Sequence, residues 1–401
     1  MKVSNRWTAA AIVAVLAVGT PSLAATPKAG AACPSVNKIV KVKTTNFKCT
    51  KKGKKLVWVA TTVSVVAPTK PPVPAPEPAP SETPTPAPTE TATPAPAPAW
   101  VALPPSSTAA DAWARSGWTK PSSGAVTTAA ATKEFLSYIA TVRNPNAQVT
   151  IWAEPGSDPT LVDWVTKGSA VVARSFEVPA PLDQFNDVIA VSRKYLVDTF
   201  TKLYDDRYAD AQAGAFDSGN PAWGGRTSNA WAMSTIINGK MMINDKPGMA
   251  QTSGHEYFHA IQENFVNASG SNCGACGTPQ WFWEGPAMFV GLQTASSLGI
   301  IDYSNEGRPV MLSRVNNAPT GKLKLSQVSE NTPPSIDPYG IGDVATEFLV
   351  ANVGMKKFID IYRQLGYNDF PTAFEKATGV PLTDFYLMFE DARSDLGVPQ
   401  K

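Results

Sequence analysis

The sequence has little net charge, no long apolar stretch after its first 25 residues, and few cysteines and histidines, and these absences exclude several classes of function. The chain has 35 Lys and Arg against 33 Asp and Glu in 401 residues, and the net charge of +2 gives no basis for nucleic acid or an anionic surface as the main partner. After the first 25 residues no stretch approaches the roughly 20 apolar residues of a membrane-spanning helix, so we expect no transmembrane segment. Cysteine occurs four times and histidine only twice. With 43% hydrophobic residues, the chain can still form one large globular domain or two smaller ones.

Residues 1–25 have the pattern of a secretory signal peptide. Lys2 and Arg6 give the segment a positively charged start, and the apolar run WTAAAIVAVLAVG follows. PSLAAT then offers small residues for cleavage after Ala24 or Ala25. The run is short for a membrane span, so we expect cleavage and an exported protein that is extracellular or associated with the cell surface. An uncleaved anchor is the alternative.

Export determines how the four cysteines are interpreted. In an oxidising compartment the simplest pairing is two local disulfides, Cys33 with Cys49 and Cys273 with Cys276. The CGAC stretch could also be half of a zinc knuckle or a redox pair. A knuckle needs a second ligand pair, and the other two thiols lie far upstream, so we favour disulfides.

A small basic module is predicted over residues 26–66. Apolar residues and Lys alternate there, with eight Lys between 38 and 55 and no acidic residue, which fits a β-hairpin pinned by Cys33 and Cys49. The stretch CTKKGKKLVW resembles short modules appended to secreted actinobacterial proteins. The lysines form either a solvated face or a surface that adheres to an anionic cell-wall polymer.

A spacer is predicted over residues 67–100. Proline recurs every few residues, fixes φ and removes a backbone donor, so this Pro/Thr/Ala-rich segment cannot build a packed core. At about 3.1 Å per residue it could hold its ends on the order of 90 Å apart. We expect it to separate the basic module from a working domain.

The working domain, residues 101–401, is predicted to have an α+β fold. Its first half, 101–250, alternates helical and strand patterns, and 251–401 is mainly helical, so a mixed sheet with helices is followed by a helical half. The Gly-rich stretch DSGNPAWGGRTSN precedes GKMMIND, residues 239–245, which is predicted as the last strand. Two further strands are predicted in AQVTIWAE and NDVIAVS, and three helices in TKEFLSYIATV, TLVDWVTKGSAVVARSF and RKYLVDTFTKLYDD.

Both histidines lie in SGHEYFHAIQENF, residues 253–265. Residues at i and i+4 share one face of a helix, so His255 and His259 can direct two imidazoles at a single ion. Glu256 lies about 100° round the helix, close enough to hold a water at that ion. This is the HExxH pattern of zinc hydrolases, in which the Glu is the general base. The alternative is two unrelated histidines in the core or on the surface of a helix.

A catalytic zinc needs a third protein ligand and an open position. Glu263 lies about 12 Å along the helix axis from His255, too far to share one ion. The pattern HExxHxxGxxH is absent, because Gln262 and Phe265 occupy the Gly and His positions. Glu284 opens the apolar helical run in PQWFWEGPAMFVG, and an antiparallel helix beside the first would bring it to the metal. Alternatively, Glu284 meets the dipole of its own helix N-terminus.

The two motifs together resemble those of the gluzincin metallopeptidases, in which HExxH is followed on a later helix by a Trp-containing stretch ending in E-G and a small residue. The resemblance implies a thermolysin-like zincin domain, His255, His259 and Glu284 as ligands of one Zn2+, and Glu256 as base. DPYGIGDVATEFLVANVG is similar to the Tyr-Gly helix of the aminopeptidase-like members, where the Tyr donates to the developing oxyanion. It implies that role for Tyr339, which could otherwise cap a helix.

Departures from the family pattern refine these expectations. The GxMEN signature that holds a substrate amine in aminopeptidases is absent, which favours an endopeptidase. Met288 stands where thermolysin-like members carry an acid that orients a His, so Asp343 is considered for that task. Asp337 is the second candidate for third ligand.

The sequence therefore predicts a secreted zinc metallopeptidase, a hydrolase that acts on peptide or protein substrates with a metal-activated water. One alternative is a peptidase specialised for glycoproteins or cell-wall peptides, suggested by the basic module and the spacer. Another is a non-catalytic cell-surface or wall-binding protein with a structural metal site. Trp281, Phe282 and Trp283 either wall a substrate pocket or fill the core.

Overall fold

The structure, a computed structural model, describes two compact units, one within residues 39–61 and the other within 100–399. The predicted signal peptide, nearly all of the spacer, and the side chains of the predicted disulfides lie outside the residues described. Among the helices described, none has the length and apolar character that crossing a membrane requires. The described residues are 39–42, 45–52, 55–61, 100–178, 184–204, 206–219, 222–226, 232–239, 246–267, 277–318, 322–329 and 336–399.

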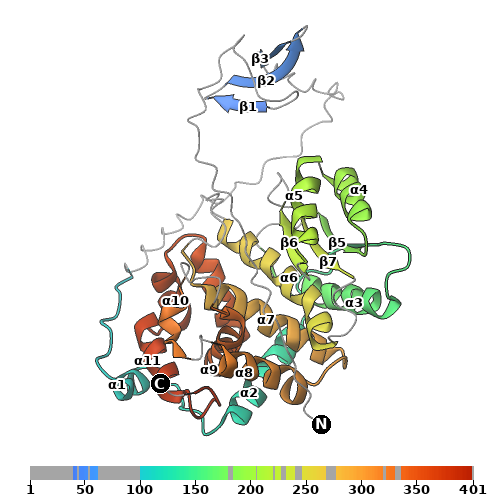
Figure 1. Ribbon diagram of the computed structural model, residues 1–401. Coiled ribbons are helices and arrows are strands. Elements are labelled where there is room, and N and C mark those ends of the chain that lie inside the picture. Colours follow the sequence, from blue (N-terminus) through green and yellow to red (C-terminus); the bar gives the residue numbers. More distant parts are fainter. Residues whose placement is uncertain are drawn as a thin grey trace, which may run out of the picture. The chain divides into compact units, whose positions relative to one another are not determined.

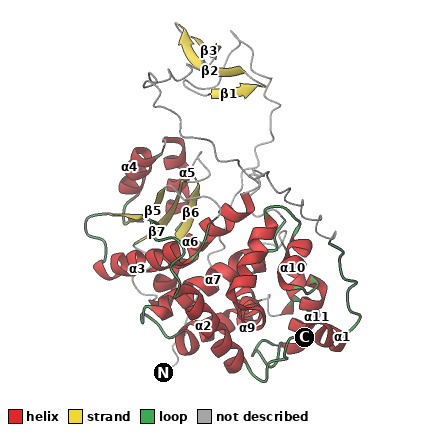
Figure 2. Ribbon diagram, turned by 180° about the vertical axis from the view of Figure 1, so that it is seen from behind, coloured by secondary structure: helices red, strands yellow, loops and turns green. Residues whose placement is uncertain are grey.

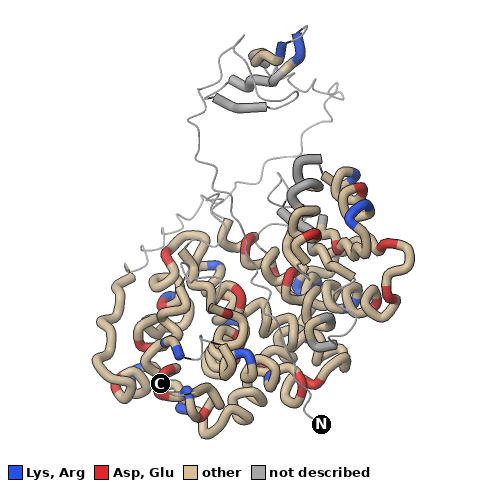
Figure 3. Tube along the Cα trace, viewed as in Figure 1, with Lys and Arg blue, Asp and Glu red and all other residues tan. Residues whose placement is uncertain are grey.

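The smaller unit is a three-stranded antiparallel sheet of order β1-β2-β3, which has one strand more than a single hairpin. Trp58 is buried, whereas Lys51, Lys52 and Lys55 are exposed where β2 ends and β3 begins (Figure 3). The strands are β1 (Ile39–Val42), β2 (Thr45–Lys52) and β3 (Lys55–Thr61).

The larger unit contains a mixed sheet of order β4-β5-β7-β6, in which the first three are parallel and β6 is an antiparallel edge strand. These strands are β4 (Val149–Ala153), β5 (Gln184–Ala190), β6 (Ala222–Arg226) and β7 (Ala232–Asn238). The strands predicted in AQVTIWAE and NDVIAVS are confirmed. β6 lies in the Gly-rich stretch for which no element was predicted, and β7 ends before the predicted strand 239–245, of which only Gly239 is described, as a turn.

Helices cover both faces of this sheet (Figure 1). Val188 and Ile236 pack with Phe200 on the side of α4 (Arg193–Leu203) and α5 (Asp206–Asp217). The next residues along the strands, Ile189 and Ile237, face α3 (Pro159–Ser175) on the other side. Because both faces of the central strands are covered, successive residues such as Ile236 and Ile237 are both buried and apolar, without alternation.

The remaining described residues are mainly helical and build the largest core (Figure 2). The predicted α+β class is confirmed, because the described strands of this unit all lie between Val149 and Asn238. The long helix α9 (Pro338–Leu365) is interrupted at Gly354, where φ is 75°. The other helices are α1 (Ala109–Ser116), α2 (Gly124–Ile139), α6 (Lys246–Val266), α7 (Gln280–Ser297), α8 (Arg308–Asn317), α10 (Phe370–Thr378) and α11 (Leu382–Ala392), with a short π-helix η2 (Tyr303–Gly307) and a short 3-10 helix η4 (Leu325–Gln327).

Two close helix crossings, each made through glycine, bring α6, α7 and α9 together. A Cβ on Gly291 of α7 would lie 2.5 Å from the Gln251 carbonyl oxygen of α6. A Cβ on Gly285 of α7 would collide with the backbone of Gly342 of α9. Because Gly285 directly follows Glu284, the second crossing positions the start of α7 against α9 without room for a larger side chain.

Candidate metal centre

Three candidate metal ligands converge from two helices. The Nε2 atoms of His255 and His259 on α6 are 3.1 Å apart, and Glu284 Oε2 on α7 lies 3.6 Å from the first and 3.3 Å from the second. Ligand atoms 2.0–2.1 Å from a tetrahedral zinc ion would be separated by roughly 3.3 Å. The three donors therefore fit around one such ion, and their residue types suit it.

The antiparallel run of α6 and α7 produces this convergence. Gly254 faces Gly291, whereas Gln262, two turns further along α6, bonds to Trp283 near the start of α7. The start of α7 therefore lies beside the part of α6 that contains His259, which brings Glu284 next to His259. The arrangement of the second helix that the sequence analysis required is present.

Glu256 is buried beside the three ligands and faces the edge of the sheet. The backbone N–H of Gly224 in β6 donates to its carboxylate. Burial raises the pKa of Glu256, and the neighbouring charges of His255 and His259 oppose that rise only in part. A carboxyl group so placed is suited to exchanging protons with a water at the centre.

The ligand charges are strongly coupled. Burial by itself would lower the pKa of His259, but the charge of Glu284 and its hydrogen bond outweigh this and raise the pKa to about 9. Burial would raise the pKa of Glu284, but His259 and His255 outweigh it and hold that pKa below its usual range. A cation bound at neutral pH would therefore replace a proton on His259.

Tyr339 lies at the N-terminal end of α9, near His255. Its ring centroid is 5.9 Å from that of His255, and the Arg314 guanidinium lies 4.9 Å above the ring. Burial and then the charges of Glu284 and Glu256 raise the pKa of Tyr339 well above its usual value. The hydroxyl is therefore a proton donor throughout the neutral range.

Asp337, the second candidate for third ligand, has another structural task. Its carboxylate accepts from the Tyr339 backbone N–H at 2.9 Å and from Arg314 Nε at 2.7 Å. It thus caps α9 and anchors Arg314, and in the described part of the chain it does not belong to the group of ligand atoms. Its contacts hold Tyr339 beside His255.

The three aromatic residues before Glu284 divide between the core and the centre. Trp281 and Phe282 are fully buried in the core. Trp283 is half-buried and stacks on His259, with ring centroids 5.7 Å apart and an interplanar angle of 22°. Gln262, which the sequence analysis treated only as the absence of a glycine, accepts from His259 Nδ1 at 2.7 Å. Residues three positions apart are neighbours on a helix, so the spacing of Gln262 from His259 could have indicated this contact from the sequence.

Asp343, considered for orienting a ligand, belongs instead to a buried polar network in the core. The Tyr303 hydroxyl lies 3.1 Å from Asp343 Oδ2 and 2.9 Å from Glu347 Oε2. Arg308 Nε contacts both Glu347 oxygens, at 3.0 and 2.9 Å. Burial and then the charge of Glu347 raise the pKa of Asp343 well above its usual value. The Tyr303 hydroxyl has one proton for two carboxyl groups, and the raised pKa favours a protonated Asp343 that donates to Tyr303 while Tyr303 donates to Glu347.

Replacing Asp343 by Asn should stabilise the protein above about pH 4. The pKa of Asp343 is raised on folding, so the folded state holds a proton that the unfolded chain releases above its ordinary pKa of about 3.9. The free energy of unfolding consequently falls as the pH rises from the unfolded-state pKa of about 3.9 towards the raised folded-state pKa. Asn does not titrate and lacks this dependence. We expect Asp343→Asn to gain about 1 kcal/mol or more at pH 7 and little at pH 4, measured by denaturant unfolding.

The control is Asp198→Asn, which removes an exposed carboxylate paired with Lys194 and should change stability by less than about 0.5 kcal/mol. Parallel pH profiles for wild type and Asp343→Asn would contradict the assignment of a proton to Asp343.

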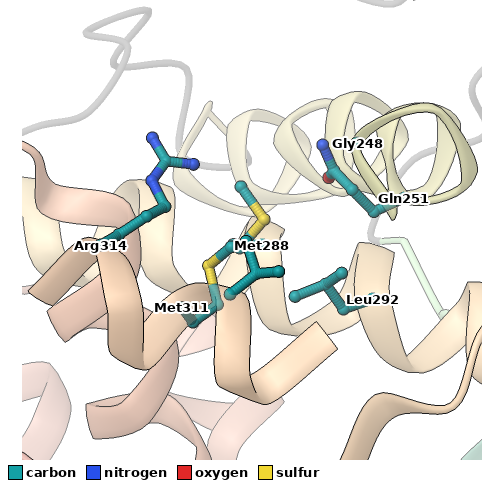
Figure 4. A pocket seen from close by; sticks show the side chains of 7 residues that line it. Gly248, Gln251, Met288, Leu292, Met311 and Arg314 are labelled. Carbon is teal, nitrogen blue, oxygen red and sulfur yellow. The ribbon is translucent and has the colours of Figure 1, made fainter. Parts of the chain in front are cut away.

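A hollow lies between α6, α7 and α8 (Figure 4). Gln251 lies one turn before His255 on α6, and Met288 one turn after Glu284 on α7. Most of its lining is apolar, with the Arg314 side chain at one side. The lining residues are Gly248, Gln251, Met288, Leu292, Val310, Met311 and Arg314.

No protein-family model matches the sequence, and no curated protein or solved structure is detectably similar to it. The structure itself defines an α+β protein in which two histidines and a glutamate lie close enough to hold a metal ion.

Proposed function

We propose that this chain is an exported zinc-dependent endopeptidase of the gluzincin type, with a thermolysin-like catalytic domain. The observation that supports this most is the convergence of His255, His259 and Glu284 beside Glu256, a buried carboxyl group that is additional to the three ligands. A purely structural metal site has no use for such a group, which argues against the alternative of a non-catalytic binding protein.

The chemistry that a bound zinc ion would supply is polarisation of the scissile carbonyl and a lowered pKa of a water, to about 7. Glu256 accepts the proton of that water and delivers it to the departing amine. Its burial supports this role, because a raised pKa brings a carboxyl group nearer to the operating pH.

Tyr339 is proposed to donate a hydrogen bond to the oxygen that gains negative charge. Its ring is held between His255 and Arg314, and Arg314 is in turn anchored by Asp337. The Tyr339 hydroxyl is thus already in position to donate to the substrate oxyanion before substrate binds.

An extended peptide has two surfaces on which to bind. β6 pairs only with β7 in the described part of the chain, and its Gly224 contacts Glu256, so main-chain hydrogen bonds to β6 would align a peptide beside the base. The hollow next to Met288 would accept an apolar side chain close to the cleaved bond.

Digestion of a mixed peptide pool by the full mature chain loaded with Zn2+, analysed by mass spectrometry, tests the proposal. We expect internal cuts with an apolar residue next to the cleaved bond. Cuts confined to peptide termini would contradict the endopeptidase assignment. A protein that binds zinc and cuts no peptide in the pool would contradict peptidase function and favour the surface-binding alternative.

A further inference from the structure

We propose that Gln262 is a positioning residue that fixes the tautomer of His259, so that the lone pair of Nε2 faces the metal. The inference rests on the metal centre of the proposed function but not on peptidase activity. His259 Nδ1 lies 2.7 Å from Gln262 Oε1, and Gln262 is 0% exposed. At this burial no water is available to replace a missing partner, so the direction of this hydrogen bond depends on the protein alone.

The orientation of the Gln262 amide follows from its two other contacts. Its Nε2 lies 2.9 Å from the Trp283 carbonyl oxygen and 2.9 Å from the Tyr362 hydroxyl. A carbonyl only accepts, so the NH2 group must face Trp283. A flipped amide would set Oε1 against the Trp283 carbonyl oxygen and would lose the bonds donated to Trp283 and Tyr362. Oε1 therefore faces His259.

The Tyr362 hydroxyl is itself oriented by a proline. Pro286 lies inside α7 and has no N–H, so the Phe282 carbonyl, four residues earlier, lacks its helical donor. Tyr362 donates to that carbonyl at 3.0 Å. The hydroxyl proton is thereby used, and its oxygen is left to accept from Gln262.

These contacts require a hydrogen on His259 Nδ1, whether the ring is charged or neutral. Gln262 Oε1 can only accept, so His259 Nδ1 must carry a hydrogen, and in the neutral ring Nε2 is then unprotonated. That nitrogen lies 3.3 Å from Glu284 Oε2, among the candidate ligand atoms. Trp283 contributes twice, because its carbonyl orients Gln262 while its ring stacks on His259.

His255 has no comparable support. Its Nδ1 is buried and has no hydrogen-bond partner among the described residues. The outer contacts of the centre are therefore asymmetric, with the ring of His259 held by Gln262 and Trp283. Outer partners of this kind typically change metal affinity by about 10–100-fold.

The test compares Zn2+ affinity, by competition with a chromophoric chelator, for the full chain and the variants Gln262→Met and Gln262→Glu. Both variants lose the amide donors to Trp283 and Tyr362, and Glu also sets an oxygen against the Trp283 carbonyl, so the folding of both is measured by denaturant unfolding. Only Glu keeps an oxygen that accepts from His259 Nδ1. We expect the affinity to fall about 10–100-fold with Met and to stay within a few fold of wild type with Glu. Equal affinities for the two variants would overturn the proposal.

A second measurement needs no variant. The chain has only two histidines, so the imidazole region of a long-range 1H–15N spectrum of the tag-free, Zn2+-loaded protein contains two rings. We expect His259 to carry a slowly exchanging proton on Nδ1 and to bind zinc through Nε2. Zinc on Nδ1, or a wild type that binds no zinc, would overturn the proposal. Zinc binding as expected without peptide hydrolysis would contradict the proposed function alone.

Discussion

Glu256→Gln is expected to lower kcat/KM for peptide hydrolysis by about 10²–10⁴-fold, the range typical of a lost general base, while Zn2+ affinity stays within a few fold. The amide has the shape of the carboxylate, and its oxygen can still accept from the Gly224 N–H. What it cannot do is take a proton from water. Steady-state hydrolysis of a peptide found in the mixed-pool digest, with zinc content measured in parallel, gives both quantities.

A matched change on the same helix controls for this experiment. Glu263→Gln makes the same substitution in α6, about 12 Å from His255 along the axis, and should change kcat/KM by less than about twofold. If Glu256→Gln kept full activity, the base would have to be another residue. If it lost zinc together with activity, Glu256 would be a ligand and not a base.

Glu284→Ala should have the largest effect on the metal itself. Removal of one of three protein ligands should weaken Zn2+ binding by more than the 10–100-fold typical of an outer partner, and peptide hydrolysis should fall to background. The charge of Glu284 also raises the pKa of His259, so the variant should release less than the wild-type amount of protons when zinc binds at neutral pH. Titration calorimetry in buffers of different ionisation enthalpy measures affinity and proton release together.

Asp337→Ala is the informative comparison, because Asp337 was the other candidate for third ligand. Its carboxylate is engaged by Arg314 and by the start of α9, so its loss should leave Zn2+ affinity within a few fold. Loss of zinc binding in Asp337→Ala with retention in Glu284→Ala would reverse the assignment of the third ligand.

Local sequence patterns account for the parts of the site that lie within one helix. The i and i+4 spacing places His255 and His259 on one face whatever the rest of the chain does, and Glu256 follows one step round. Apolar runs and helical periodicity likewise predicted the α+β class and two of the strands of the mixed sheet. The contribution of Glu284 followed from a helix that had to return antiparallel.

Contacts between distant segments decided what the sequence left open. β6 contains two glycines and no β-branched residue, and it is a strand only because β7 pairs with it. The sequence by itself determined that two histidines share one helical face, with a carboxylate one step round the helix. Only the tertiary structure determined that Glu284 and not Asp337 completes the group, and that Gln262 supports His259. The physical reason is that hydrogen bonds across packed helices depend on which backbones approach closely, which here depends on the crossings at Gly291 and Gly285.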